Sequence, residues 1–180
     1  HKLAADAIAA KLDGVAVDLN TPIDKNSKFE ILTFDSKDGK EVLRHSAAHV
    51  LAHAVTDLYP KALPTIGPAV EDGFYYDFDM QPLSSDDLAK IEARMKEIIK
   101  ADLPFKRTVV TKKKAVELFK DNKYKVELIE EFGGGQVAIY EQGAFKDFCR
   151  GPHVQSTGKI GAVKLMKVAG AYWRGDAKNQ

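Results

Sequence analysis

Histidine and cysteine, two residue types that can do chemistry, are concentrated in two short segments of the chain. Residues 44–53 and 147–153 hold four of the five histidines and the only cysteine. In the first segment, His45 and His49 are four residues apart in a run of good helix formers. Because positions i and i+4 share one face of a helix, this spacing predicts two imidazoles side by side.

The second segment contributes Cys149 and His153, again four residues apart. Three imidazoles and one thiol are typical ligands of a tetrahedral zinc site, and the same groups can serve as general acids and bases. Each pair alone has a simpler interpretation, namely two ordinary histidines on a half-exposed helix face, or a cysteine buried as a small apolar residue. The two segments together favour a functional site.

Two neighbouring residues narrow the chemistry of the first segment. The helical metalloprotease pattern needs a glutamate directly after the first histidine, and Ser46 stands there instead. His53 lies one turn beyond His49, but its position drifts around the helix. We therefore expect His53 to support the site or the fold rather than to act in the chemistry.

The composition is that of an ordinary globular protein and excludes several classes. Of 180 residues, 44% are apolar and 29% are charged, and the net charge is +1, so any nucleic-acid contact must come from local patches. A single cysteine cannot form an internal disulfide and suits a reducing compartment. The sequence contains no apolar run of transmembrane length and no signal-peptide pattern. We therefore expect a cytoplasmic protein without membrane contact.

Residues 1–39 are predicted to form a small unit at the front of the chain. The alanine-rich residues 2–12 favour a helix, and strands are expected at 15–19 and 28–34. A polar break at 35–40 marks the predicted domain boundary. Because so few residues cannot bury a self-sufficient core, this unit is either part of a small α+β module or packs on the residues after position 40.

The remaining residues, 40–180, are predicted to mix helices and strands. Helices are expected at 40–59, 84–102, 111–120 and 126–132, and strands at 66–70, 73–78, 105–110, 136–140, 145–149, 162–169 and 170–176. This pattern predicts the α+β class, an antiparallel sheet with helices packed on one side. The helix at 40–59 carries His45 and His49.

Two groups of residues admit both a nucleic-acid interpretation and a structural one. Tyr75, Tyr76 and Phe78 could stack on bases, but aromatic residues of a sheet more often pack in a core. Three consecutive lysines at 112–114 oppose the dipole at the start of their helix. They could contact phosphates, although a solvated helix face is the more common explanation.

Six motifs, in order along the chain, resemble the N-terminal region of threonyl-tRNA synthetases of the bacterial type. They are Arg-His-Ser-Ala-Ala-His at 44–49, Ile-Gly-Pro at 66–68, Gly-Phe-Tyr-Tyr-Asp at 73–77, Tyr-Lys-Val at 124–126, Asp-Phe-Cys-Arg-Gly-Pro-His at 147–153 and Gly-Ala-Tyr-Trp-Arg-Gly at 170–175. Residues 40–180 resemble the editing domain of this family, also called the second additional domain, which alanyl-tRNA synthetases share. Residues 1–39 resemble the later part of the small β-grasp (TGS) module that precedes it.

The resemblance implies hydrolysis of serine wrongly esterified to threonine tRNA, which makes Ser-tRNA(Thr) the expected partner. Serine lacks one methyl group of threonine, and one methyl gives only ~1–3 kcal/mol of discrimination. A second pocket too small for threonine removes the error. The aminoacylation core of the family would follow Asp176, so neither ATP binding nor threonine activation is expected. The family forms homodimers through that core, and this chain is expected to be a monomer.

The resemblance also assigns roles to particular residues. Around the ester and the attacking water it places His45, His49, Cys149 and His153, with one imidazole as the base. Lys125 matches the family's active-site lysine, which faces the oxyanion or the terminal ribose hydroxyl. Asp147 matches its acidic partner and should bind the amino group of the seryl moiety. Tyr140 is expected to line the pocket. The candidate tRNA contacts are Lys112, Lys113, Lys114 and Arg150.

Ligand type and family point in different directions on the metal. Three histidines and one cysteine are a zinc set, and the corresponding residues hold zinc in the alanyl branch. In the threonyl branch, editing is pictured as using an ordered water and the active-site lysine without an obligate metal. An ammonium at Lys125 would also repel a dication. We expect that the reaction requires no metal, and that zinc is the ion this site could bind. Two alternatives stay open, namely a structural zinc or tRNA-binding module without hydrolytic activity, and a free-standing deacylase of the alanyl type.

Overall fold

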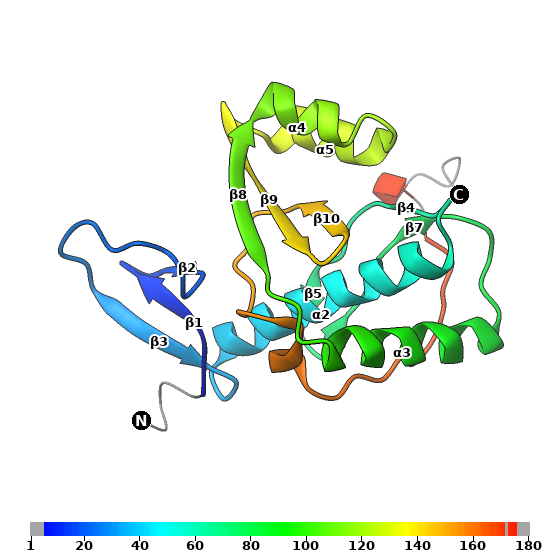
Figure 1. Ribbon diagram of the computed structural model, residues 1–180, viewed down its shortest axis with the longest axis horizontal. Coiled ribbons are helices and arrows are strands. Elements are labelled where there is room, and N and C mark those ends of the chain that lie inside the picture. Colours follow the sequence, from blue (N-terminus) through cyan, green and yellow to red (C-terminus); the bar gives the residue numbers. More distant parts are fainter. Residues whose placement is uncertain (1–5, 172, 176–180) are drawn as a thin grey trace.

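One helix runs through the centre of the molecule and carries the first two site histidines. The computed structural model describes residues 6–171 and 173–175, and α2 (Lys37–Leu58) lies in its middle (Figure 1). The helix begins at Lys37 rather than at position 40, because the Ser36 side chain caps it by accepting a hydrogen bond from the Gly39 amide. The predicted polar break is therefore the start of the helix.

The N-terminal sheet is antiparallel, with the strand order β2-β1-β3. Its strands are β1 (Ala7–Leu12), β2 (Val15–Val17) and β3 (Phe29–Thr33). The helix predicted at 2–12 is therefore wrong over residues 7–12, and residues 2–5 lie outside the described part of the chain. The alanine content and the apolar spacing of this run favour a helix locally, but strand pairing on both of its edges overrides that preference.

This sheet packs on α2 instead of forming a core of its own. Ile8 and Leu32 are buried in the same apolar cluster as Val42 of the helix. At the junction, a Cβ added to Gly39 would clash with the carbonyl oxygen of Thr33, so glycine lets the helix and the strand approach. The N-terminal sheet thus depends on the helix that comes after it in the chain.

The helix α3 (Ser85–Lys100) packs against α2 and completes the main core. Its buried side includes Ile91, Met95 and Ile98. Ser84 begins the helix through a capping box, which agrees with the predicted start. The core between the two helices holds α2 in place from one side.

The end of the described chain lies along α3 without pairing into a sheet (Figure 1). The Leu165 amide donates a hydrogen bond to the Glu92 side chain on that helix. The strands predicted at 162–169 and 170–176 are therefore wrong for the described residues, and Trp173–Gly175 form a 3-10 turn. Positions 172 and 176 lie outside the described residues. The residues at 162–169 have β propensity, but propensity alone does not form a strand when no partner strand in the described part of the chain lies beside them.

A second antiparallel sheet, with the order β10-β9-β8, supports the cysteine-bearing segment. Its strands are β8 (Lys106–Thr111), β9 (Gln136–Gln142) and β10 (Phe145–Phe148). Two helices accompany it, α4 (Lys112–Leu118) and α5 (Lys123–Phe132). Ala115, Ile129 and Ile139 share a separate apolar cluster there. The elements predicted between residues 105 and 149 are thus present.

Two short strand pairs complete the fold. They are β4 (Leu63–Pro64) with β7 (Phe78–Asp79), and β5 (Ala69–Val70) with β6 (Gly73–Phe74). The α+β class is confirmed, although the antiparallel strands of the described residues are divided among four small sheets rather than one. Nowhere in the described ranges does a helix combine the length and apolar character needed to span a membrane.

Candidate active site

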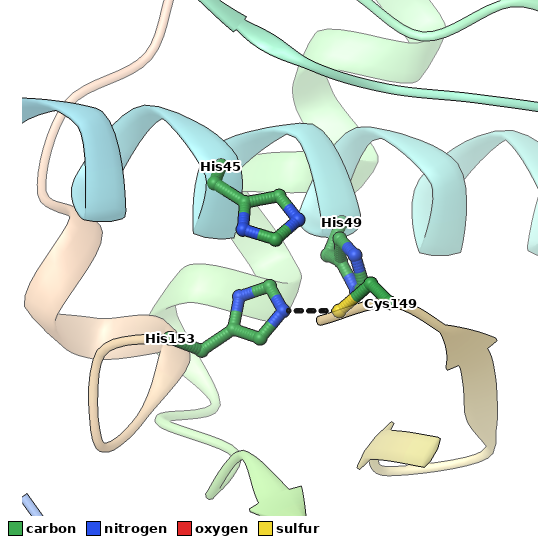
Figure 2. Close-up of side chains that lie close together, drawn as sticks. All are labelled: His45, His49, Cys149 and His153. Carbon is green, nitrogen blue, oxygen red and sulfur yellow. Dashed lines mark hydrogen bonds between the residues drawn. The ribbon is translucent and has the colours of Figure 1, made fainter. Parts of the chain in front are cut away.

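The four residues singled out by their spacing meet at one point (Figure 2). His45 and His49 come from successive turns of α2, Cys149 directly follows β10, and His153 lies in the loop after it. One nitrogen or sulfur atom of each residue lies within 4.8 Å of the corresponding atom of every other. The ring centroid of His153 is 4.3 Å from that of His45 and 4.2 Å from that of His49. We call these four residues the cluster.

The four cluster residues are not equally buried. His49 and His153 are buried, whereas His45 and Cys149 are half-buried. The ring of Phe105 stacks on His153, with 4.8 Å between the centroids and 5° between the planes. His45 and Cys149 are therefore the more accessible members of the cluster.

The hydroxyl of Ser46 determines which ring nitrogen of His153 carries the proton. Its Oγ lies 2.8 Å from the Val42 carbonyl oxygen, and 3.1 Å from both His153 Nδ1 and the Val154 amide nitrogen. A hydroxyl donates one proton, and the carbonyl takes it, so Oγ accepts from the other two groups. His153 is therefore protonated at Nδ1, and the lone pair of Nε2 faces the Cys149 thiol at 3.1 Å.

Burial keeps the titratable groups of the cluster neutral near pH 7. It lowers the pKa of His49 to about 3, although the nearby Asp147 carboxylate acts in the opposite direction. Burial also lowers the pKa of His45 and that of His153, and it raises the pKa of the Cys149 thiol. Three neutral imidazoles therefore offer lone pairs that can accept a proton or bind a metal.

A buried network next to the cluster joins Asp147, Lys125 and Tyr76. Lys125 Nζ lies 2.5 Å from Asp147 Oδ1 and donates a 2.8 Å hydrogen bond to the Tyr76 hydroxyl, which donates to Asp147 Oδ2 at 2.5 Å. His49 Nε2 is 3.6 Å from the same Oδ2 and connects the network to the cluster. Burial alone would raise the pKa of Asp147, but Lys125, His49 and the hydrogen bonds lower it on balance. Asp147 is therefore ionised.

The start of α5 positions Lys125 against this carboxylate. The Asn122 side chain caps the helix by accepting hydrogen bonds from the amides of its first turn, including that of Lys125. The same side chain donates a 2.8 Å hydrogen bond to the Pro64 carbonyl oxygen. Because both ends of the Asn122 amide are bound, the backbone that carries Lys125 is fixed in position.

Two tyrosines reach the site from different elements. Tyr140, on β9 opposite Asp147, packs its ring against His153 with 4.6 Å between the centroids. Tyr76 is buried, in agreement with the structural interpretation of its segment, and its hydroxyl joins the Asp147 network. Tyr75 is exposed. Tyr140 thus contacts the cluster directly, whereas Tyr76 is connected to it only through Asp147.

The residues predicted to contact tRNA are not brought into the cluster. Lys112, Lys113 and Lys114 open α4, where Lys112 donates to a backbone carbonyl of α5 and Lys114 pairs with Glu117. Arg150 is exposed, with its guanidinium 5.8 Å from the centroid of the Phe132 ring. These cations lie on the surface.

His53 is also outside the cluster. Its ring stacks on Phe145 with 5.6 Å between the centroids, and its Nε2 lies 3.5 Å from Asp57. This placement fits the supporting role expected for it.

Three residues that sequence patterns alone do not assign to the site also contribute to it: Ser46, Tyr76 and Asp18. Ser46 had a signal, because it lies between the two histidines of one helix face. Tyr76 had one in the Gly-Phe-Tyr-Tyr-Asp motif. Asp18 had none, because its contacts with Tyr140 and His153 join parts of the chain that are far apart in sequence.

The cluster could hold a metal ion such as zinc. Bonds of about 2.0–2.3 Å in a tetrahedron place the ligand atoms about 3.3–3.8 Å apart, so modest side-chain shifts from the present spacing of up to 4.8 Å would complete the set. The hydrogen bond from His153 Nδ1 to Ser46 leaves Nε2 available as a ligand. The residues present therefore fit a zinc ion.

Comparison with known proteins places this fold and site in a class. Residues 137–180 match the family described as "Threonyl and Alanyl tRNA synthetase second additional domain". The matched segment contains Tyr140, Asp147, Cys149 and His153, which is the part of the site supplied by β9, β10 and the following loop.

Relatives extend the similarity to nearly the whole chain. The threonine–tRNA ligase of Rubrobacter xylanophilus is 52% identical over 179 residues, which are 99% of this chain and 28% of the relative. That of Syntrophotalea carbinolica is 53% identical over 182 residues, covering 98% of this chain and 28% of the relative. The chain therefore corresponds to the N-terminal region of the threonine–tRNA ligase family and includes its second additional domain. It spans about 28% of the length of these relatives.

Proposed function

We propose that this chain hydrolyses serine from Ser-tRNA(Thr), as the editing part of a threonine–tRNA ligase. The main support is one site in which neutral imidazoles lie beside a buried Lys125–Asp147 pair. Ester hydrolysis needs a base for the attacking water and a group that stabilises the developing oxyanion. The site offers both kinds of group, and Asp147 lies between them, 3.6 Å from His49 Nε2 and 2.5 Å from Lys125 Nζ.

In this proposal, a neutral imidazole of the cluster accepts a proton from water as the water oxygen attacks the ester carbonyl. The same proton then goes to the ribose oxygen when the ester bond breaks, so serine and free tRNA leave and the imidazole is restored. His153 is our candidate base, because its Nε2 lone pair is set by Ser46 and points toward Cys149 inside the cluster. The water would replace the thiol as the partner of Nε2.

In this proposal, Lys125 and Asp147 also contact the substrate. An ammonium has three protons to donate; one is directed at Tyr76, and the charge is paired with Asp147 Oδ1 at 2.5 Å. A remaining proton is available for the oxyanion or the terminal ribose hydroxyl. Asp147 stays ionised and retains lone pairs for the amino group of the seryl moiety. The carboxylate thus orients the amino acid whose ester bond is cut.

Discrimination in this proposal comes from size. One methyl group is worth only ~1–3 kcal/mol in a pocket that accepts both amino acids, so the aminoacylation site cannot reject serine completely. A pocket that lacks room for the threonine methyl hydrolyses the serine ester and leaves the threonine ester intact.

The proposed reaction does not require a metal, because an imidazole of the cluster supplies the base and Lys125 supplies the donor to the oxyanion. If zinc is bound, it would be held by His45, His49, Cys149 and His153, and it would supply a Lewis acid that activates water. Chelation therefore separates the two versions.

The test is the rate of serine release from Ser-tRNA(Thr) under single-turnover conditions, beside Thr-tRNA(Thr), with and without a strong chelator. We expect rapid loss of serine alone, unchanged by the chelator. Loss that stops on chelation would make the cluster a zinc site. Absence of hydrolysis at concentrations where tRNA binding is demonstrated would contradict the enzyme proposal and favour a binding module.

A pair of histidine variants on α2 provides the matched control. His49→Gln removes a cluster imidazole, whereas His53→Gln removes one that is a single turn away and faces Asp57. We expect hydrolysis to fall at least about 100-fold in the first variant, because the imidazole that lies between His153 and Asp147 is lost from the acid–base site, and to stay near the parent rate in the second.

A further inference from the structure

A carboxylate that directly follows a strand of the N-terminal sheet contacts the loop that carries Cys149 and His153. Asp18 directly follows β2, and its two oxygens have different partners. Oδ1 accepts a 2.8 Å hydrogen bond from the backbone amide of His153, and Oδ2 accepts a 2.7 Å hydrogen bond from the Tyr140 hydroxyl. Both bonds are charge-assisted, which makes them stronger than bonds between neutral groups.

The two partners of Asp18 hold the Cys149–His153 loop from two directions. The hydrogen bond from the His153 amide to Asp18 fixes the backbone at His153 directly. The Tyr140 ring packs against the His153 ring, and a Cβ added to Gly151 would clash with the Tyr140 hydroxyl oxygen. Tyr140 therefore supports the middle of the loop at a position where only glycine fits.

Asp18 is well placed to hold this geometry. Its side chain is only 17% exposed, so competition from water for its oxygens is limited. Its backbone carbonyl accepts a hydrogen bond from the Thr21 amide, which closes the turn after β2. Arg107 Nε lies 4.0 Å from Oδ2 and partly balances the charge. The carboxylate is thus anchored in the N-terminal sheet while it holds the site loop.

We infer that Asp18 is a positioning residue for the editing site, through which the N-terminal sheet sets the geometry of Cys149 and His153. The inference rests on the proposed function for its catalytic consequence, but the geometric part can be tested without any substrate. Asp18 acts through His153 and Tyr140 rather than on the reacting atoms. The N-terminal sheet is then part of the site and not an independent appendage.

The first test measures how fast the Cys149 thiol reacts with a chromogenic aromatic disulfide, in the presence of a chelator. Cys149 is the only cysteine in the chain, so the signal reports on this loop alone. We expect Asp18→Ala to react about tenfold faster than the parent, because the loop opens, while the melting temperature shows that the chain is still folded. The matched control is Asp24→Asn, which changes an exposed carboxylate of the same N-terminal segment.

Asp18→Asn separates geometry from charge. The asparagine carbonyl can accept from the His153 amide, and its amino group can donate to the Tyr140 hydroxyl. We expect thiol reactivity within about threefold of the parent and single-turnover serine release close to the parent rate. Asp18→Ala should lower the rate of the chemical step about tenfold or more, with little change in the concentration of Ser-tRNA(Thr) needed for half-saturation.

Tyr140→Phe keeps the test decisive if Asp18→Ala does not fold. It removes the hydroxyl and should raise thiol reactivity by a smaller factor, and the double variant should react no faster than Asp18→Ala alone. Thiol reactivity of Asp18→Ala equal to that of Asp24→Asn would overturn the inference. Equal impairment of Asp18→Asn and Asp18→Ala would also overturn it, because charge rather than position would then matter. If the Cys149 thiol reacts faster in Asp18→Ala but the parent chain does not hydrolyse Ser-tRNA(Thr), only the proposed function is contradicted.

Discussion

Ser46 shows how a single hydroxyl controls the chemistry available to a buried histidine. By donating to the Val42 carbonyl, it can only accept from His153 Nδ1, and the base or ligand position is thereby set at Nε2. The Ser46 side chain is fully buried, so nothing from solvent can replace it. The residue acts on the reaction only through the tautomer of its neighbour.

Ser46→Ala should therefore damage both stability and catalysis. It leaves His153 Nδ1 and the Val154 amide without their partner, which costs about 1–3 kcal/mol for a buried polar group. We expect serine release to fall about 10–100-fold, and the imidazole nitrogen shifts of His153 to change from one tautomer to a mixture. Thr56→Val is the control, because Thr56 makes a similar bond to a carbonyl of the same helix away from the cluster. A single Nδ1-protonated tautomer in Ser46→Ala would contradict this account.

The buried histidines also predict how stability depends on pH. Their folded pKa values lie below the unfolded value of about 6.5, and that of His49 lies at about 3. Below pH 6.5 the unfolded chain binds protons that the folded chain does not, so the free energy of unfolding falls as pH falls through this window. Each such imidazole contributes up to ~1.4 kcal/mol per pH unit. Asp147, whose folded pKa is lowered, loses its contribution only below the unfolded value of about 3.9.

Urea titrations between pH 7 and pH 5 measure this effect. We expect stability to fall steeply over this range in the parent, and the slope to decrease in His49→Gln by up to one bound proton. A free energy of unfolding that does not change between pH 7 and pH 5 would mean that the cluster is already protonated or exposed.

At the scale of elements, the start of α5 determines where the charged group of Lys125 lies. Asn122 and Ser84 are both N-caps, of α5 and α3, and each accepts hydrogen bonds from the amides of the first turn. Only the turn capped by Asn122 carries a residue of the site, Lys125. The two caps therefore contribute similarly to stability and differently to function.

Replacing each cap by alanine tests this difference. Asn122→Ala and Ser84→Ala should each lower the free energy of unfolding by about 0.5–2 kcal/mol. We expect serine release to fall several-fold only in Asn122→Ala, because Lys125 then loses its fixed place beside Asp147. Melting curves and single-turnover rates measure the two effects separately. Equal rates in the two variants would show that the cap does not position Lys125.

The same scale shows where sequence reasoning succeeds. The helix α2, the strands β8 to β10 and the starts of α3 and α4 have strong local signals, so His45, His49, Cys149 and His153 could be placed before their contacts were known. The helix predicted at 126–132 instead begins at Lys123, because the Asn122 side chain caps it. The alanine-rich strand β1 could not be recognised, because its pairing with β2 and β3 depends on residues outside the local window. The extended C-terminal stretch is held by Glu92 of α3, which no local pattern encodes.

At the scale of the whole molecule, the predicted boundary near residue 39 does not correspond to a gap in packing. Leu32 on β3 is fully buried in the same apolar cluster as Val50 and Val55 of α2. Asp18 adds a polar link from the same sheet to His153. The site is therefore assembled from parts that the sequence divides between two units.

Leu32→Ala tests whether these parts unfold together. A buried leucine replaced by alanine costs about 2–5 kcal/mol, and we expect helical and near-ultraviolet signals to shift together as one cooperative transition. Phe29→Ala on the same strand is the control, because Phe29 is 52% exposed and should change stability by about 0.5 kcal/mol or less. If the helical signal kept its midpoint while another probe shifted, the N-terminal sheet would be an independent unit. A common shift means that the core around α2 includes this sheet, so the geometry of the candidate active site depends on both sides of the predicted boundary.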